Sequence, residues 1–182
     1  LAVKKIDPLL LKGDGSFFLP MRDEGKVARY AASTFGVLDT WQFADCPKPS
    51  ALAQDVERQR LFVACRGDDP VLIVADRETG EVKAKLPIGR DVNAVAYDAQ
   101  HRRLLIPSGV DANLMVIDQQ DADHYALAAT VSTLPMAYNM AFDAQRQRVY
   151  LPAMDYVLPA AEPKADPQFQ ADTFSITTLA LD

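Results

Sequence analysis

Few side chains in this sequence have the type and spacing that catalysis or metal binding requires. Neither of the two histidines, His101 and His124, has partners at metal-ligand spacing, so no haem, copper or zinc site is expected. The adjacent carboxylates Asp68 and Asp69 suit solvation, or weak Ca²⁺ binding, better than acid–base catalysis. No nucleophile elbow, phosphate-binding glycine loop, dinucleotide-binding or zinc-protease motif occurs. We therefore predict no catalytic residue, metal site or cofactor from this chain alone, although a site assembled from distant segments would leave no local motif.

The arginines offer a different chemistry, which is the binding of anions. A guanidinium group presents a planar set of N–H donors that matches a carboxylate or a phosphate. Arg22, Arg66 and Arg90 could act together in this way if the fold brings them to one place. The alternative is that each arginine pairs with a neighbouring aspartate. The choice between the two depends on the elements that position these side chains.

An internal repeat of 43 to 45 residues supplies those elements. Residues 50–67, 93–109 and 139–153 each contain a small-apolar strand that ends in aspartate, a polar turn with arginine, and a strongly apolar strand. The three aspartates are Asp55, Asp98 and Asp143. Because the same pattern recurs at a fixed spacing, each copy is expected to form one structural unit.

A third and a fourth strand follow in each unit, and an earlier, weaker unit has the same order. The second strand of the earlier unit covers residues 16–20; third strands are expected at 27–31, 71–76 and 114–118, and fourth strands at 36–43, 82–88 and 125–133. Four short antiparallel strands per repeat is the pattern of a propeller blade, whereas an immunoglobulin-like sandwich has no such period. The sequence therefore predicts an all-β fold, a β-propeller of about four blades with four antiparallel strands each.

The repeat also predicts where the blades begin and end within a single propeller region. The approximate blades are residues 11–43, 44–88, 89–133 and 134–182, with residues 1–10 as a strand of a preceding or closing blade. In the last unit, residues 157–170 hold three prolines and are expected to form a long loop, and residues 172–182 a third strand. Either residues 1–10 supply the missing fourth strand and close a ring, or further blades exist; we favour the incomplete ring.

The repeats resemble those of the YVTN-repeat (surface-layer-type) β-propellers. The resemblance is carried by LFVACRG at 61–67, VADRETGEVKAKLPIG at 74–89, VNAVAYDAQHRRLLIPSG at 92–109, LMVID at 114–118 and ATVSTLPMAYNMAFDAQRQRVYLPA at 129–153. It covers roughly residues 45–155 and implies the C-terminal part of a ring of usually about seven blades. The chain would then be a fragment, one chain of a split propeller or a small four-bladed ring. The resemblance also implies a periplasmic or cell-surface protein.

Propeller topology predicts which connections share a face. The connections between strands 2 and 3 and between successive blades lie on one side, here called the loop face, and the remaining turns lie on the opposite side, the turn face. The residues that we expect to bind a ligand or partner on the loop face are Arg22, Lys48, Arg66, Asp68, Arg90, Asp111, Asn113 and Asn139. The turn face gathers Asp55, Asp98 and Asp143, for which we expect a structural role.

The two cysteines are either buried free thiols or one disulfide. Cys46 lies in the connection between blades and Cys65 ends the second strand of the same blade. Both therefore fall at the loop-face edge of adjacent antiparallel strands, within the Cα separation that a disulfide needs. We predict a Cys46–Cys65 bond, which indicates an oxidising compartment: the periplasm, the cell surface or the extracellular space.

Charge and composition restrict the function further. The formal net charge of −6 argues against broad nucleic-acid binding and against adhesion to anionic lipid, and no apolar run is long enough for a membrane span. We predict a binding or scaffold propeller whose partners are a protein, the missing blades of the same ring or a small anionic ligand. The first alternative is a propeller subunit of a periplasmic quinoprotein or haem enzyme. A weaker alternative is a Ca²⁺-dependent lactonase-like hydrolase, to which only Asn93, Asn139 and Asp91 could contribute.

Overall fold

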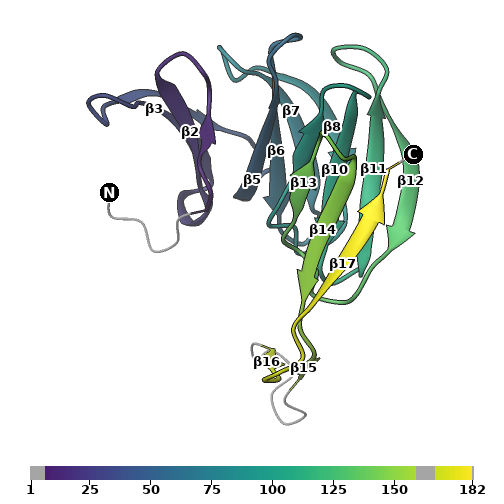
Figure 1. The fold of residues 1–182 in the computed structure, drawn as a ribbon. Coiled ribbons are helices and arrows are strands. Elements are labelled where there is room, and N and C mark those ends of the chain that lie inside the picture. Colours follow the sequence, from purple (N-terminus) through teal and green to yellow (C-terminus); the bar gives the residue numbers. More distant parts are fainter. Residues whose placement is uncertain (1–6, 159–166, 182) are drawn as a thin grey trace.

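Antiparallel β-sheets, stacked side by side in an arc that does not close, make up the molecule (Figure 1). The computed structural model describes residues 7–158 and 167–181. The first sheet contains β1 (Leu10–Leu11), β2 (Ser16–Met21), β3 (Lys26–Ala31) and β4 (Val37–Gln42), and the second contains β5 (Lys48–Asp55), β6 (Arg60–Arg66), β7 (Val71–Asp76) and β8 (Val82–Pro87). The third contains β9 (Ala96–Asp98), β10 (Arg103–Ser108), β11 (Asn113–Gln119) and β12 (Tyr125–Ser132), and the fourth contains β13 (Ala141–Asp143), β14 (Arg148–Ala153) and β17 (Ser175–Ala180). The predicted all-β propeller of about four blades is confirmed.

The two ends of the described chain differ in detail from expectation. Leu10 pairs with Phe18 of β2, so the first sheet begins inside the segment that we expected to belong to a preceding or closing blade. Residues 1–6 of that segment lie outside the described residues. The expected loop at 157–170 contains parts of β15 (Tyr156–Val157) and β16 (Gln168–Phe169), a two-strand hairpin that projects from the fourth sheet (Figure 1). The expected third strand of the last unit is β17, which pairs with β14.

Most of the core lies in the three interfaces between neighbouring sheets, and a further buried cluster is formed by β2 and β3 of the first sheet alone. Alternation along β6 explains how one strand serves two interfaces: Leu61 and Val63 pack toward the first sheet, and Phe62 and Ala64 toward the third. All four side chains are 0% exposed. Leu105 of β10 continues the pattern by packing against Val149 and Leu151 of the fourth sheet. Buried apolar area on both faces of the central sheets therefore fixes the order of the sheets and, with it, the positions of the loops.

A recurring aspartate forms the tight turn between the first two strands of three sheets. Its carboxylate accepts a backbone N–H two or three residues later: Arg58 N at 3.1 Å from Asp55, Gln100 N at 3.1 Å from Asp98, and Arg146 N at 3.0 Å from Asp143. The residue that follows in each turn has a left-handed backbone, with φ of 55° at Gln59, 53° at Arg102 and 51° at Gln147. These repeated side-chain-to-backbone bonds set the register of the strands.

No described helix has the length and apolar character needed to cross a membrane.

Candidate functional site

Backbone hydrogen bonds hold several loop-face connections together. Asn93 N donates to Tyr138 O at 3.2 Å, which joins the segments that enter the third and fourth sheets. Gly109 N donates to Asp91 O at 3.2 Å, and Met136 N donates to Gly109 O at 2.8 Å. Gly109 also lies directly on Tyr138, because an added Cβ at this glycine would be 2.8 Å from Tyr138 Cδ1. These bonds give the loop face a defined shape.

Arg22 and Arg66 converge on one amide oxygen at the centre of this face. Arg22 belongs to η1 (Arg22–Glu24), the 3₁₀ turn after β2, and Arg66 ends β6 in the next sheet. Asn93 Oδ1 accepts from Arg22 Nη2 at 2.9 Å and from Arg66 Nη1 at 2.7 Å. Two guanidinium groups therefore meet at a neutral acceptor, although the sequence places them 44 residues apart.

Each arginine also pairs with a carboxylate, as the alternative interpretation required. Arg22 binds Asp7 through Nε, at 3.0 Å from Oδ2, and through Nη2, and both side chains are only 12% exposed. Arg66 pairs with Asp91, whose backbone is left-handed with φ of 62°. The site thus contains two ion pairs linked by an amide.

Burial and like charge raise the free energy of the charged groups in this cluster. Burial, followed by the nearby Arg22 guanidinium, lowers the pKa of Arg66. Burial raises the pKa of Asp7, although Arg22 acts in the opposite direction. Each arginine of the cluster therefore has one aspartate as its ion-pair partner, in surroundings that disfavour the charged forms of Arg66 and Asp7.

Two hollows open around the arginine pair. The larger, of ≈ 640 Å³, has the polar cluster on one side and an apolar wall on the other. Its apolar lining consists of Val110, Met136, Tyr138, Tyr156, Leu158, Pro167 and Phe169. The second hollow, of ≈ 340 Å³, shares Arg22, Arg66 and Asp91 and adds Lys48 and Asp23. The volume and mixed lining of the larger hollow are typical of small-molecule pockets.

The structure brings together Arg22, Lys48 and Arg66 from the predicted set and places the others elsewhere. Arg90 pairs with Asp111 at the exposed end of the third sheet, through Nε at 2.8 Å from Oδ1. Asn113 donates to the backbone oxygen of Asp111 at 3.4 Å. Asp68 lines a groove with Lys85, and Asn139 lines an adjoining apolar hollow that shares Met136, Tyr138 and Phe169 with the larger one. Arg90 therefore does not join Arg22 and Arg66.

Sequence reasoning missed several side chains of the site. Asp7 belongs to a segment without a repeat equivalent, so no periodicity connects it with Arg22. Met136 lies in a connection, and Tyr156 and Phe169 lie in two-residue strands that are too short for apolar spacing to predict. Asn93 and Asp91, which were named as contributors to a metal-dependent hydrolase, are part of the arginine cluster. Among the described residues, no group of three or more histidine, cysteine, aspartate or glutamate side chains could hold a metal ion.

The predicted disulfide is present beside this face. Cys46 and Cys65 are bonded, with Cα atoms 5.1 Å apart, and each is 1% exposed. The bond joins the segment entering the second sheet to the end of β6, the strand that carries Arg66. It thereby fixes the backbone directly before Arg66.

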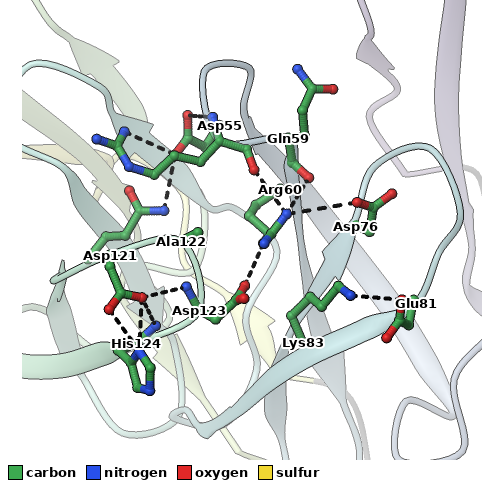
Figure 2. A network of polar contacts seen from close by, with 12 residues as sticks. Asp55, Gln59, Arg60, Asp76, Glu81, Lys83, Asp121, Ala122, Asp123 and His124 are labelled. Carbon is green, nitrogen blue, oxygen red and sulfur yellow. Dashed lines mark hydrogen bonds and ion pairs between the residues drawn. The ribbon is translucent and has the colours of Figure 1, made fainter.

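The turn face holds a separate polar network that links the second and third sheets (Figure 2). Asp55, which is 2% exposed, accepts from Gln119 Nε2 at 3.0 Å and from Tyr97 OH at 3.2 Å. Arg60 Nε donates to Asp123 Oδ1 at 2.7 Å, across the same boundary (Figure 2). Since these contacts join neighbouring sheets, their role is structural.

Comparison with solved structures identifies the architecture. Hydrazine synthase from Kuenenia stuttgartiensis matches 84% of this chain and 43% of its own, with TM-score 0.70 and 12% identity. The periplasmic gluconolactonase PpgL from Pseudomonas aeruginosa matches 71% of this chain and 40% of its own, with TM-score 0.59 and 19% identity. BamB from Moraxella catarrhalis matches 80% of this chain and 39% of its own, with TM-score 0.58 and 13% identity.

The chain thus spans about two fifths of the length of these neighbours, at 39% to 43%. No protein-family model matches the chain, and no curated protein matches it in sequence. The solved neighbours are β-propeller proteins. At this level of identity the likeness shows the fold, and we conclude that this chain is a β-propeller segment whose sheets do not close a ring.

Proposed function

We propose that this chain is part of an extracytoplasmic β-propeller that binds a ligand or partner on its loop face and has no catalytic site of its own. The observation that carries this proposal is the convergence of Arg22 and Arg66, from two different sheets, on Asn93 beside a hollow with an apolar wall. Clustered donors next to apolar surface are suited to recognition. The aspartates nearest to the arginines are held in ion pairs, which leaves them poorly placed as general bases.

Two observations support the extracytoplasmic part of the proposal. A fully buried disulfide persists in oxidising compartments and is rare in the cytosol. One structural neighbour is described as a periplasmic gluconolactonase. The resemblance of the repeats to surface-layer-type propellers agrees with such a location.

The test is a binding screen on the native protein, with thermal stability as the signal. Small carboxylates, phosphates, neutral sugars and amines would be added in turn, because a ligand that binds only the folded state raises Tm. We expect at least one class to raise Tm, and the increase to be lost in Arg66→Gln. As a control, Arg103→Gln removes an arginine from an ion pair with Asp118 in the third sheet, away from the hollow.

Two results would contradict the proposal. One is a ligand-induced increase in Tm that survives Arg66→Gln but disappears when turn-face residues are changed. The other is a chain of the native complex that carries haem or quinone absorbance and docks on this face, which would favour the redox-subunit alternative. A hydrolase activity that requires added Ca²⁺ would favour the lactonase-like alternative.

A further inference from the structure

We propose that the hollow beside Arg22 and Arg66 binds a small amphipathic carboxylate, with the carboxylate at the two guanidinium groups and an apolar body against Met136, Tyr156 and Phe169. This inference rests on the proposed binding function and adds the chemical class of the ligand. Three observations support it: the free donors of the arginines, the local balance of charge, and the apolar wall of the hollow.

The arginines retain N–H donors after their protein contacts are counted. Arg22 uses Nε and Nη2 for Asp7 and Asn93, and within the described residues its Nη1 has no acceptor. Arg66 uses Nη1 for Asn93 and Nη2 for Asp91, and its Nε has no acceptor in the same part of the chain. None of these nitrogen atoms is among the buried polar atoms that lack a partner. Arg22 and Arg66 both line the hollow, so a ligand oxygen placed there would lie next to these donors.

The charge balance favours a singly charged, planar anion. Asp7 and Asp91 already neutralise one charge each, and Asp23 lies across from Lys48 in the adjoining hollow. A dianionic phosphate would bring a second negative charge close to these carboxylates, which like-charge repulsion opposes. A carboxylate adds one charge and has two oxygens that match the guanidinium fork. Because Arg22 and Arg66 already share Asn93 Oδ1, one carboxylate beside it could contact both guanidinium groups.

The opposite wall of the hollow is apolar and exposed. Val110 is 51% exposed, Leu158 is 60% exposed and Phe169 is 45% exposed, and all three line this hollow. Tyr156 and Phe169 form an aromatic pair with ring centroids 6.4 Å apart, on the hairpin of β15 and β16. Removal of these groups from water favours a ligand with an aliphatic or aromatic body. A carboxylate without such a body would leave the wall exposed to solvent.

Isothermal titration calorimetry on the native protein tests the inference with four probes. They are 3-phenylpropionate, its neutral amide, acetate and phenyl phosphate. We expect 3-phenylpropionate to bind at least tenfold more tightly than any of the other three. Phe169→Ala should weaken the binding of 3-phenylpropionate and leave the binding of acetate unchanged, because the Phe169 side chain contacts only the apolar body of the ligand.

Variants of the arginines separate charge from geometry. Arg66→Gln should weaken the binding of 3-phenylpropionate at least tenfold. Arg66→Lys keeps the charge but loses the planar fork of N–H donors, so its affinity should lie between those of the unmodified protein and Arg66→Gln. Arg90→Gln is the matched control, because Arg90 pairs with Asp111 and does not line the hollow. Circular dichroism and Tm of each variant verify folding. If an arginine variant unfolds, the comparison of acid and amide on the unmodified protein still tests whether the site selects the carboxylate.

The outcomes distinguish this inference from the proposed function. If the acid and the amide bind with equal affinity and both lose that affinity in Phe169→Ala, the carboxylate class is overturned, but the hollow is still a binding site. Tighter binding of phenyl phosphate also overturns it and leaves the binding function. No binding of any probe overturns the inference, and the wider ligand screen by thermal stability then decides on the proposed function.

Discussion

The aspartate that recurs in the repeat turns has a different environment in each sheet. Asp55 lies 2% exposed between two sheets and binds Gln119 and Tyr97 across the boundary. Asp98 is 1% exposed, and its Oδ2 lies 2.7 Å from Nδ1 of the exposed His101. Asp143 is confined to its own exposed turn, with Arg146 as its partner. The same residue type at one repeat position therefore contributes differently to stability.

This difference predicts that the same substitution lowers the free energy of unfolding by different amounts in different turns. Asp55→Ala removes the carboxylate that accepts from the Gln119 amide and the Tyr97 hydroxyl, which then keep only their bonds to each other and to Tyr125, so the free energy of unfolding should fall by about 1–3 kcal/mol. Asp143→Ala, the matched control, removes only an exposed turn bond and should lower the free energy of unfolding much less. Urea unfolding monitored by tryptophan fluorescence would measure both. Equal losses in the two variants would show that the bonds between sheets add nothing to the turn itself.

Tyr125 predicts how stability depends on alkaline pH. Burial raises the pKa of Tyr125 to about 12, and burial also raises the pKa of Tyr97. The unfolded tyrosine ionises near its ordinary pKa of about 10, while the folded one keeps its proton. The contribution of the Tyr125 phenol to the free energy of unfolding is therefore complete below pH 10. It is lost as pH rises through about 12, because the folded state binds more protons than the unfolded state in this window.

Urea midpoints measured between pH 9 and pH 12 would test this dependence. The midpoint should fall more steeply above pH 10 in the unmodified protein than in Tyr125→Phe, which has no phenol to ionise. Part of the slope should remain in the variant because of Tyr97. A variant with the same slope as the unmodified protein would assign the pH dependence to other groups.

At this scale the sequence predicts local roles better than contacts between distant residues. The turn role of Asp55, Asp98 and Asp143 follows from their position at the end of a strand, and the structure has these turn bonds. The contact between Asp7 and Arg22 could not be inferred, because nothing in the spacing indicates that a chain end folds back to a loop of the first sheet. Repeat geometry puts Arg22 and Arg66 at equivalent positions of neighbouring sheets but leaves open whether they converge, and Arg90, which was considered with them, pairs with Asp111.

Among the elements, the β7–β8 turn shows how one sheet depends on its neighbour. Gly80 lies in this turn with φ of 74°, and an added Cβ would overlap the indole ring of Trp41 in β4. Gly80→Ala combines a left-handed backbone with a steric clash between sheets. We expect a loss of about 2–4 kcal/mol in the free energy of unfolding.

Gly13→Ala is the matched control for this effect. Gly13 also has a positive φ, of 95°, but an added Cβ there meets nothing within 4 Å. Its cost should be only the backbone term of about 1 kcal/mol. Thermal unfolding of both variants gives the comparison. If Gly80→Ala costs no more than Gly13→Ala, Trp41 can move aside and does not tie the two sheets together.

Element boundaries are predictable wherever the repeat is regular. Short continuous apolar runs and turn signals predict β6, β7 and β10, because each of these strands is buried and flanked by polar turns. The hairpin of β15 and β16 is not predicted, since two-residue strands beside several prolines have no measurable periodicity. That hairpin carries Tyr156 and Phe169, so the same irregularity conceals much of the apolar wall of the candidate site.

At the scale of the whole molecule, the outer face of the fourth sheet lacks a neighbour within the described chain. Along β14, Val149 and Leu151 are buried against the third sheet, whereas the intervening Tyr150 and Pro152 are only partly covered. Ile176 of β17 is 55% exposed and Phe174, just before it, is 62% exposed. In the second sheet the corresponding positions on β6 are completely buried from both sides. The apolar surface of the fourth sheet is therefore of the kind that another blade covers.

We predict that further blades, from the same polypeptide or from another chain, cover this face in the native protein. The native mass from multi-angle light scattering should be roughly twice the 20.0 kDa of this chain or more, since the solved neighbours are more than twice as long as the part they share with it. Denaturing mass spectrometry separates the two sources of blades, because a longer polypeptide keeps its mass and an assembly does not. Ile176→Asp should lower the native stability or mass, whereas Leu127→Asp, on the outer strand β12 and 57% exposed, should leave both unchanged. A stable native particle of 20.0 kDa that is indifferent to Ile176→Asp would mean that the fourth sheet ends the structure, and the arginine cluster would then line an open groove instead of a central channel.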